Sequence, residues 1–507
     1  MEIVVRTSQG LVAGLVDNGV RTWRGVPFGA DTSGKHRWRA PRAAHQWRGV
    51  RDCTAYGPIA PQPIYSWTDQ VQGSEDCLNL DIVRPDSDDE LPVVVYLHGG
   101  SFIVGASHQS VLQGHTFVKN LDVVYVSINF RLGALGYLNM HSVGEGDCVA
   151  NPAIRDQLLA LQWVHENIAA FGGDPTNVTL MGESAGGAAV TTLMCVPSAR
   201  GLFHRAIAQS APIAAVHSAA QSEFWARELA YHMAMPRHSS ITALRLESAD
   251  DVVRAGQSMM WRSREFLQLN PCYCPTVDGS FVLQHPVEAF NQGNQVRVPL
   301  LIGTNRDETS FSKLFYLRQS ARGKAAQRML NAFDPSNTER VLSAYWGAVE
   351  RQHFSELLCD ALFWAPSLKV AQAHSRVAPT WMYRFDFAPK ALKMLGIGAM
   401  HSLELLAVFG DADASRTRSL ARWGGDGELE EVTEFIQYLW GNFIHVGSPG
   451  WEWPRYQMPT DTRPGRATMI FNTESELVFD PRAGRRKAWS GFNARMGRCK
   501  PTVKLGV

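Results

Sequence analysis

Short apolar runs alternate with longer segments of helical character over much of the chain. The clearest runs are Leu91–Leu97 and Asn177–Met181, and Val298–Gly303 is another. A continuous apolar run of this length is typical of a strand in a sheet whose two faces are both covered. The alternation of such strands with helical patterns from Leu91 to about Gln209 predicts an α/β fold, with a mostly parallel sheet and helices on both faces.

A serine between two glycines follows the run that ends at Met181. Gly182 and Gly186 flank Ser184 in a G-x-S-x-G pattern, and Ala185–Met194 has the pattern of a helix rich in small residues. Glycines at these positions let the chain turn sharply between strand and helix, which exposes the serine hydroxyl above the sheet. Ser184 is therefore a candidate nucleophile, and the N–H of Ala185 is a candidate donor to a developing negative charge.

A glycine-rich loop, His98-Gly-Gly-Ser-Phe102, follows the run that ends at Leu97. An acyl-transfer enzyme needs N–H donors directed at an oxyanion, and glycines supply them without side chains in the way. Gly99, Gly100 and Ser101 fit this requirement. Taken alone, however, the Gly-Gly pair would be better explained as a plain turn after a strand.

These segments and several others resemble the type-B carboxylesterase family, which includes para-nitrobenzyl esterases, animal carboxylesterases and cholinesterases. In chain order the other segments are Val20–Ala30, Arg39–Pro41, Trp47–Cys53, Ser74–Asp81 with its E-D-C-L-x-L pattern, Ile128–Tyr137, Arg155–Pro175, Trp440–Phe443, Gly447–Pro449 and Trp453–Pro454. Several long motifs in the family's order are far more specific than G-x-S-x-G alone. The resemblance implies an α/β-hydrolase fold and a serine carboxylic-ester hydrolase that works through an acyl-enzyme.

In this fold class the nucleophile is followed along the chain by an acid and then by a histidine. Residues 303–309 resemble the family pattern G-x-N-x-x-E-G, which aligns Glu308 with the acid. The chain departs from the pattern at Thr309, where glycine is usual, and the neighbouring Asp307 is a rival carboxylate.

The histidine comes from Gly398–Gly410, which resembles G-x-x-H-x-x-E-x-x-x-x-F-G and aligns His401 with the base. His401 would take the proton of Ser184 and return it to the leaving group, while the acid holds the tautomer of the imidazole. By position, the family's oxyanion hole falls on the N–H groups of Gly100, Ser101 and Ala185.

Glu183 and Glu404 also stand where the family keeps carboxylates, and Ser210 is a third candidate neighbour of the site. A buried carboxylate beside the imidazole would favour its charged form. A structural hydrogen bond at a helix end is the alternative, and both interpretations stay open here.

The chain has 507 residues, of which 45% are hydrophobic, and this content supports an extensive core. We expect one α/β-hydrolase domain over residues 1–507, with helical insertions at about 213–296 and 312–378 that cover the active site. Aromatic residues in these insertions could line a hydrophobic gorge, with core packing as the alternative for each: Trp261, Phe266, Phe315, Tyr316, Phe363 and Trp364.

The charge of the chain and its lack of targeting signals limit the kinds of partner and location that we expect. The 49 basic and 48 acidic residues give a formal net charge of +1, so no overall field attracts nucleic acid, and the basic run Gly484–Lys487 is interpreted as a solvated surface run. The first residues lack the features of a signal peptide, and no segment has the apolar length of a membrane span. We therefore expect a cytoplasmic protein that acts on a small-molecule ester, without stable membrane insertion.

The eight cysteines show no paired metal spacing, so we predict neither a metal nor a cofactor. Cys53 and Cys77 match positions that form a disulfide in secreted relatives. In a reducing compartment they would be free thiols.

Two alternatives to a general carboxylesterase stay open. One is a specialised hydrolase of the same chemistry, such as a lipase or a cholinesterase. The other is a non-catalytic binding relative, which usually lacks the nucleophile.

Overall fold

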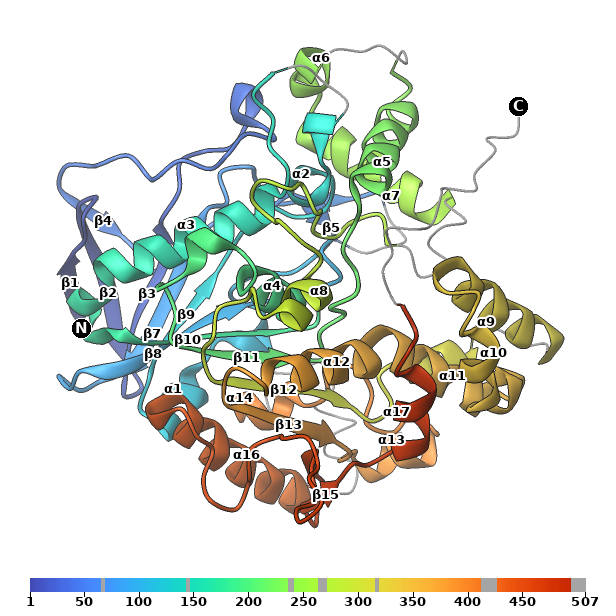
Figure 1. The fold of residues 1–507 in the computed structure, drawn as a ribbon. Coiled ribbons are helices and arrows are strands. Elements are labelled where there is room, and N and C mark those ends of the chain that lie inside the picture. The colour runs from blue at the N-terminus through green and yellow to red at the C-terminus, as the bar shows by residue number, and fades with distance from the viewer. Residues whose placement is uncertain are drawn as a thin grey trace.

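The computed structural model describes residues 1–64, 69–142, 146–235, 241–262, 271–314, 319–411 and 426–493. A 13-stranded sheet is the centre of this part of the chain (Figure 1). Its strands are β1 (Glu2–Arg6), β2 (Leu11–Asp17), β3 (Val20–Pro27), β4 (Val50–Asp52), β7 (Asn79–Pro85), β8 (Leu91–Leu97), β9 (Val124–Ile128), β10 (Gly173–Glu183), β11 (Arg205–Gln209), β12 (Leu300–Asn305), β13 (Thr380–Phe385), β14 (Ala467–Phe471) and β15 (Glu476–Phe479). A separate two-stranded sheet pairs β5 (Gln62–Pro63) with β6 (Val71–Gln72).

The middle of the large sheet is parallel. Its order is β1-β2-β3-β7-β9-β8-β10-β11-β12-β13-β14-β15, with β4 beside β2. Every pair from β9 to β14 is parallel, while the consecutive pairs from β1 to β9 and the last pair, β14 with β15, are antiparallel. The short strand β4 pairs with β2 in parallel. The predicted α/β-hydrolase fold, with a mostly parallel central sheet, is therefore confirmed.

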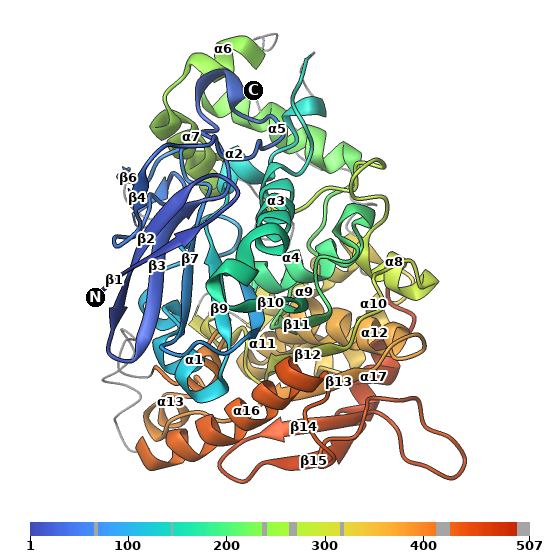
Figure 2. The ribbon, with the colours of Figure 1, turned by 90° about the vertical axis from the view of Figure 1, so that its left-hand side faces the viewer.

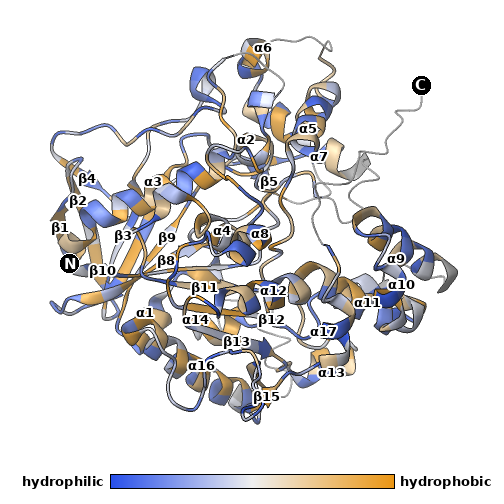
Figure 3. Ribbon diagram, in the orientation of Figure 1, coloured by the Kyte–Doolittle hydropathy of each residue, from blue (hydrophilic) through white to orange (hydrophobic). Residues whose placement is uncertain are grey.

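Helices cover both faces of the sheet, as the continuous apolar runs predict. On β8, Val93, Val95 and Leu97 pack in a core with α3 (Pro152–Asn167) and α4 (Ala185–Leu193), whereas Val94 and Tyr96 pack in a second core with α1 (His115–Leu121), α14 (Leu405–Phe409) and α16 (Asp426–Val446). Figure 2 shows α3 and α4 on one side of the sheet and α1 and α16 on the other. In Figure 3 the hydrophobic colour is concentrated on the strands between these layers.

The two segments predicted as insertions are largely helical. Residues 213–296 contain α5 (Ala219–His232), α6 (Ile241–Leu246), α7 (Ala249–Arg262) and α8 (Pro286–Gln292). Residues 312–378 contain α9 (Gln319–Phe333), α10 (Thr338–Ser343), α11 (Arg351–Cys359), a π-helix at Asp360–Trp364 and α12 (Ala365–His374). In Figure 1, α5, α6 and α7 lie at the top, α8 lies near the centre, and α9 to α11 lie at the right. The division of the chain into domains stays a prediction.

The remaining elements are short. They are α2 (Gly133–Tyr137), α13 (Lys390–Met394) and α17 (Ala483–Trp489), with short 3-10 turns between the longer elements. Among the helices of the described ranges, none is both long enough and apolar enough to cross a bilayer.

Candidate active site

Ser184 lies in a sharp turn between β10 and α4. Its φ of 55° and ψ of −123° are a strained backbone conformation for a residue other than glycine. A Cβ atom at Gly186 would lie 1.9 Å from the carbonyl oxygen of Leu97, and one at Gly182 would lie 2.6 Å from the backbone of Gly186. Both glycines are therefore required, because the elbow is pressed against the end of β8.

His401 and Glu308 complete a chain of hydrogen bonds that begins at this serine. His401 Nε2 is 2.8 Å from Ser184 Oγ, and His401 Nδ1 is 2.5 Å from Glu308 Oε2. The other carboxylate oxygen, Glu308 Oε1, accepts a hydrogen bond of 2.7 Å from the N–H of Asn305, at the end of β12. Glu308 is fully buried, so its carboxylate is held by these two contacts and shielded from water.

The rival carboxylate, Asp307, turns away from the imidazole. Its Oδ2 accepts a hydrogen bond of 3.2 Å from the N–H of Ala399, and its own N–H donates to the carbonyl oxygen of Ala399. Asp307 therefore fixes the backbone two residues before His401.

The two other predicted carboxylates differ in how they reach the histidine. Glu183 Oε1 is 3.4 Å from His401 Nε2 and accepts a hydrogen bond of 2.7 Å from the hydroxyl of Ser402. Glu404 accepts hydrogen bonds from Ser210 Oγ at 2.9 Å and from Asn305 Nδ2 at 2.5 Å. The structure thus brings Glu183 next to the imidazole, whereas Glu404 and Ser210 reach it only through Asn305 and Glu308.

Burial and the close approach of these groups both shift their pKa values, in opposite directions for His401 and Glu183. Burial alone would lower the pKa of His401, but the carboxylates of Glu183 and Glu308 raise that pKa above its ordinary value. Burial also raises the pKa of Glu183, against the opposing effect of His401. The pKa of Glu404 rises to about 8, first through burial and then through Glu183 and Glu308. Glu404 is therefore mostly neutral at pH 7.

The candidate oxyanion donors lie at the ends of two adjacent strands. Gly100 and Ser101 follow β8, and Ala185 is the first residue of α4, where an N–H has no acceptor within its own helix. Gly100 has a φ of +114°, and a Cβ there would lie 1.9 Å from the carbonyl oxygen of Val104. A Cβ at Gly99 would lie 2.7 Å from Glu183 Oε2. Gly99 is thus needed for close packing against the elbow, and Gly100 for the tight turn of its own loop.

A cavity of about 330 Å³ adjoins this machinery, which is large enough for a small ligand. Gly99, Gly100, Glu183 and His401 line its polar end, and much of the remaining lining is apolar: Val111, Leu112, Met400, Leu403, Leu405 and Leu406. Ser184 is not among the lining residues, so this cavity lies beside His401 and the glycine-rich loop rather than over the nucleophile.

Of the aromatic residues predicted near the site, Phe363 touches the histidine. Its ring centroid lies 4.9 Å from that of His401, and Trp364 is buried next to it in the chain. The residues Phe266, Phe315 and Tyr316, and the side chain of Trp261, lie outside the described residues.

The seven cysteines of the described residues are free and buried. Cys53 and Cys77 are free, buried thiols, and burial raises the pKa of Cys53 to about 11. In the described part of the chain, no group of three or more His, Cys, Asp or Glu residues could hold a metal ion.

Sequence reasoning missed two residues at the site, did not single out Phe363, and misjudged one segment. Asn305 and Ser402 hold the carboxylates, and Asn305 had a signal, since it is the asparagine of the G-x-N-x-x-E pattern. Phe363 was only one of several aromatic candidates. The basic run Gly484–Lys487 is not simply a solvated surface: Arg485 is partly buried in ion pairs with Glu356 and with the fully buried Asp360, and Arg486 is partly buried in an ion pair with the nearby Asp480.

Comparisons with known proteins agree with this geometry. The model of the carboxylesterase family matches residues 1–475. The chain is 35% identical to a para-nitrobenzyl esterase of Bacillus subtilis (96% of this chain and 98% of that protein) and 31% identical to a phenmedipham hydrolase of Pseudarthrobacter oxydans (90% and 93%). A solved PNB esterase structure superposes with a TM-score of 0.86 at 32% identity and covers 96% of this chain and 99% of its own. The chain therefore belongs to the carboxylesterase family and is a carboxylesterase.

Proposed function

We propose that this carboxylesterase hydrolyses small-molecule esters through an acyl-enzyme on Ser184, with His401 as general base and Glu308 as the acid that orients it. The observation that carries the proposal is the unbroken series of contacts from Ser184 Oγ to His401 Nε2 (2.8 Å) and from His401 Nδ1 to Glu308 Oε2 (2.5 Å). Such a relay activates a hydroxyl that is otherwise a weak nucleophile at neutral pH.

In the first half of the reaction, Ser184 Oγ attacks the ester carbonyl carbon while its proton passes to His401 Nε2. The carbonyl oxygen becomes an oxyanion, which the N–H groups of Gly100, Ser101 and Ala185 stabilise. The tetrahedral intermediate then collapses: the bond to the alcohol oxygen breaks, and His401 returns its proton to the leaving alkoxide. The products of this half are a free alcohol and an acyl group on Ser184.

The second half repeats these steps with water as the nucleophile. His401 takes a proton from water, the hydroxide oxygen bonds to the acyl carbon, and the Ser184 oxygen leaves with the proton that His401 returns. The carboxylic acid is released and the serine is restored. No cofactor is required at any step, since every proton goes to or comes from His401.

The proposal is tested with a fluorophosphonate, which forms a covalent bond with an activated serine beside an oxyanion hole. We expect a single labelled residue, Ser184, in a peptide map. We also expect Ser184→Ala to lose several orders of magnitude in kcat, with a residual rate of roughly 10³ over water. Labelling at another serine, or equal labelling of Ser184→Ala, would show that the nucleophile is wrong.

A panel of esters distinguishes the classes of hydrolase. Because a similar protein is named a para-nitrobenzyl esterase, we propose para-nitrobenzyl and short-chain para-nitrophenyl esters as the first substrates, with long-chain and choline esters as comparisons. Preference for long chains or for choline would indicate a lipase or a cholinesterase. Inactivity with all of them and no fluorophosphonate labelling would indicate a binding protein.

A further inference from the structure

One helical segment, Arg351–Trp364, contacts the loops that carry both Glu308 and His401. It consists of α11 followed without a break by the π-helix Asp360–Trp364. A π-turn contains an extra residue, so it rotates the residues that follow it about the helix axis, and these rare turns occur frequently at functional sites. Glu308 and His401 themselves come from loops 93 residues apart in the sequence. Covalent geometry therefore does not set their separation, and packing must do so.

The contact with the acid loop is a reciprocal pair of hydrogen bonds next to Glu308. Thr309 Oγ1 donates to the carbonyl oxygen of Ser355 at 2.7 Å, and Ser355 Oγ donates to the carbonyl oxygen of Thr309 at 3.1 Å. Both side chains are buried. On the other side of Glu308, Cys359 Sγ lies 3.6 Å from the carbonyl oxygen of Arg306. The acid is thus flanked by two contacts with the same helix, and a glycine in place of Thr309 could not donate the first bond.

The contact with the base comes from the π-helix. Phe363 packs against His401, with 4.9 Å between the ring centroids. The histidine ring is thereby covered on one side by the segment whose preceding turns hold the acid loop.

The segment is anchored at Asp360, which is fully buried. Its carboxylate accepts a hydrogen bond of 2.5 Å from the hydroxyl of Tyr345 and one of 2.8 Å from Arg482 Nη1, and Arg485 Nη1 is 3.5 Å away. Arg485 also pairs with Glu356, one turn earlier in α11. The basic side chains at the start of α17 therefore hold the segment from behind.

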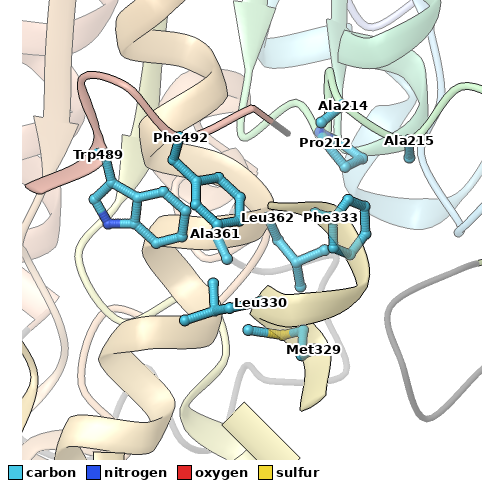
Figure 4. Close-up of a pocket in the computed structure, with 10 residues that line it drawn as sticks. All are labelled: Pro212, Ala214, Ala215, Met329, Leu330, Phe333, Ala361, Leu362, Trp489 and Phe492. Carbon is cyan, nitrogen blue, oxygen red and sulfur yellow. The ribbon is translucent and has the colours of Figure 1, made fainter. Parts of the chain in front are cut away.

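The helix α17 contacts this anchor through a further hydrogen bond and through apolar packing. Trp489 Nε1 donates to the hydroxyl of Tyr345 at 2.8 Å, which links α17 to Asp360 a second time. Figure 4 shows Trp489 and Phe492 beside Ala361 of the π-helix, around an apolar pocket. The outer side of the π-helix is thus packed against α17, while Phe363 on the same helix packs against His401.

We infer that Thr309, Ser355 and Asp360 are positioning residues: through them the segment Arg351–Trp364 sets the distance between Glu308 and His401. The inference rests on the proposed function, because it assigns these residues to the acid and base of that mechanism. None of the three touches the substrate or a reacting atom. Their effect on the rate arises from the hydrogen bond between Glu308 and His401 that they keep short.

The sharpest test removes one hydroxyl group. Thr309→Val keeps the shape of the side chain but leaves the carbonyl oxygen of Ser355 without its donor, whereas Thr309→Ser keeps the donor. We expect Thr309→Val to lower kcat about tenfold with KM within about twofold, as for an interaction expressed mainly in the transition state, and Thr309→Ser to restore most of the loss. The matched control is Thr338→Val, because Thr338 is also a buried threonine whose hydroxyl donates to a backbone carbonyl, that of Asp334 at 3.0 Å.

Two further readouts separate positioning from stability. If Glu308 moves away from His401, the downfield proton NMR signal of the His401 Nδ1–H bond moves upfield. The acidic limb of kcat/KM also moves to lower pH, because Glu308 then acts on the imidazole from further away. The other carboxyl groups that influence the imidazole are Glu183 and Glu404. Loss of stability alone lowers Tm but moves neither the signal nor the limb. Thr338→Val should lower Tm without changing the signal, the limb or kcat.

Asp360→Asn extends the test to the anchor, with Asp156→Asn as its control. Asp156 is equally buried and pairs with Arg131 at 2.6 Å, but it contacts neither catalytic loop. We expect Asp360→Asn to shift the NMR signal and reduce kcat, and Asp156→Asn to do neither at a similar loss of Tm. If Asp360→Asn does not fold, the Thr309 series decides.

The inference is overturned if Thr309→Val retains the wild-type signal and kcat, or if both controls reduce kcat as much as their partners. These outcomes are separate from failure of the proposed function. That failure would appear in the wild-type protein as an absence of fluorophosphonate labelling, and the NMR signal would still report on the position of Glu308.

Discussion

Replacing the two adjacent carboxylates Asp307 and Glu308 one at a time tests which of them orients His401. In Glu308→Gln, the amide oxygen can still accept the N–H of Asn305, which now binds Glu308 Oε1 at 2.7 Å. The NH₂ group then faces His401 Nδ1, 2.5 Å from the present Oε2. Because NH₂ is a donor, Nδ1 must accept, and the imidazole proton is forced onto Nε2. That nitrogen can no longer take the proton of Ser184.

The expected magnitude follows from this wrong tautomer. An enzyme whose orienting acid is replaced by its amide loses roughly 10²- to 10⁴-fold in kcat, which corresponds to about 3 to 5 kcal/mol at 1.36 kcal/mol per factor of ten. KM should change little, since the lost interaction is made mainly in the transition state. Asp307→Asn should do far less, because the carboxamide oxygen of asparagine can still accept the bond from the N–H of Ala399.

The assay is steady-state hydrolysis of a para-nitrophenyl ester, with circular dichroism to confirm that both variants are folded. If Asp307→Asn is the crippled variant and Glu308→Gln stays near the wild type, the assignment of the acid is wrong and Asp307 takes its place. If both variants are equally impaired, the tautomer argument fails, because only one of the two side chains contacts the imidazole.

Two further predictions concern the base and the oxyanion hole. The acidic limb of kcat/KM should lie above the ordinary histidine pKa of about 6.5, because Glu183 and Glu308 raise the pKa of His401 and only neutral imidazole acts as base. Glu183→Gln removes one negative charge and should move this limb to lower pH in a pH–rate profile. A limb at the wild-type pH in this variant would contradict the prediction. Gly100→Ala should reduce kcat by about 10²- to 10³-fold, because its Cβ would lie 1.9 Å from the carbonyl oxygen of Val104. Ser101→Ala should leave kcat within a fewfold of the wild type, since only the backbone N–H of Ser101 is used. A large loss of kcat in Ser101→Ala would assign a role to the hydroxyl.

The elements that the sequence predicts best are those specified by local chemistry. The apolar run Leu91–Leu97 is β8 over its whole length, and the run Asn177–Met181 lies inside β10. The helix predicted at Ala185–Met194 ends one residue earlier, at Leu193. The glycines of the elbow are also predicted well, because a Cβ at these positions would clash with backbone atoms a few residues away or on the adjacent strand.

The parts that escaped prediction depend on contacts between distant segments. Nothing in the run Gly484–Lys487 indicates that Arg485 faces Asp360 and Glu356, more than a hundred residues earlier. The same run on an isolated helix would be solvated. The π-helix has no recognisable sequence pattern either. Its extra residue makes sense only through its tertiary contacts, with α17 on one side and His401 on the other.

The arrangement of carboxyl groups around His401 explains how the site can stabilise the imidazolium form of this histidine. Glu183 and Glu308 lie on opposite ring nitrogens, at 3.4 Å and 2.5 Å, while the third carboxyl, Glu404, is mostly neutral at pH 7 because burial raises its pKa to about 8. In the proposed mechanism, His401 gains the proton of Ser184 between the carboxylates of Glu183 and Glu308, which need no reorganisation, and the oxyanion forms among the N–H groups of Gly100, Ser101 and Ala185. The same charges make the histidine harder to deprotonate, so the activity must be lost at a higher pH on the acidic side. Catalytic stabilisation of the imidazolium and sensitivity to acid are thus two consequences of one geometry, and Glu183→Gln should reduce both together.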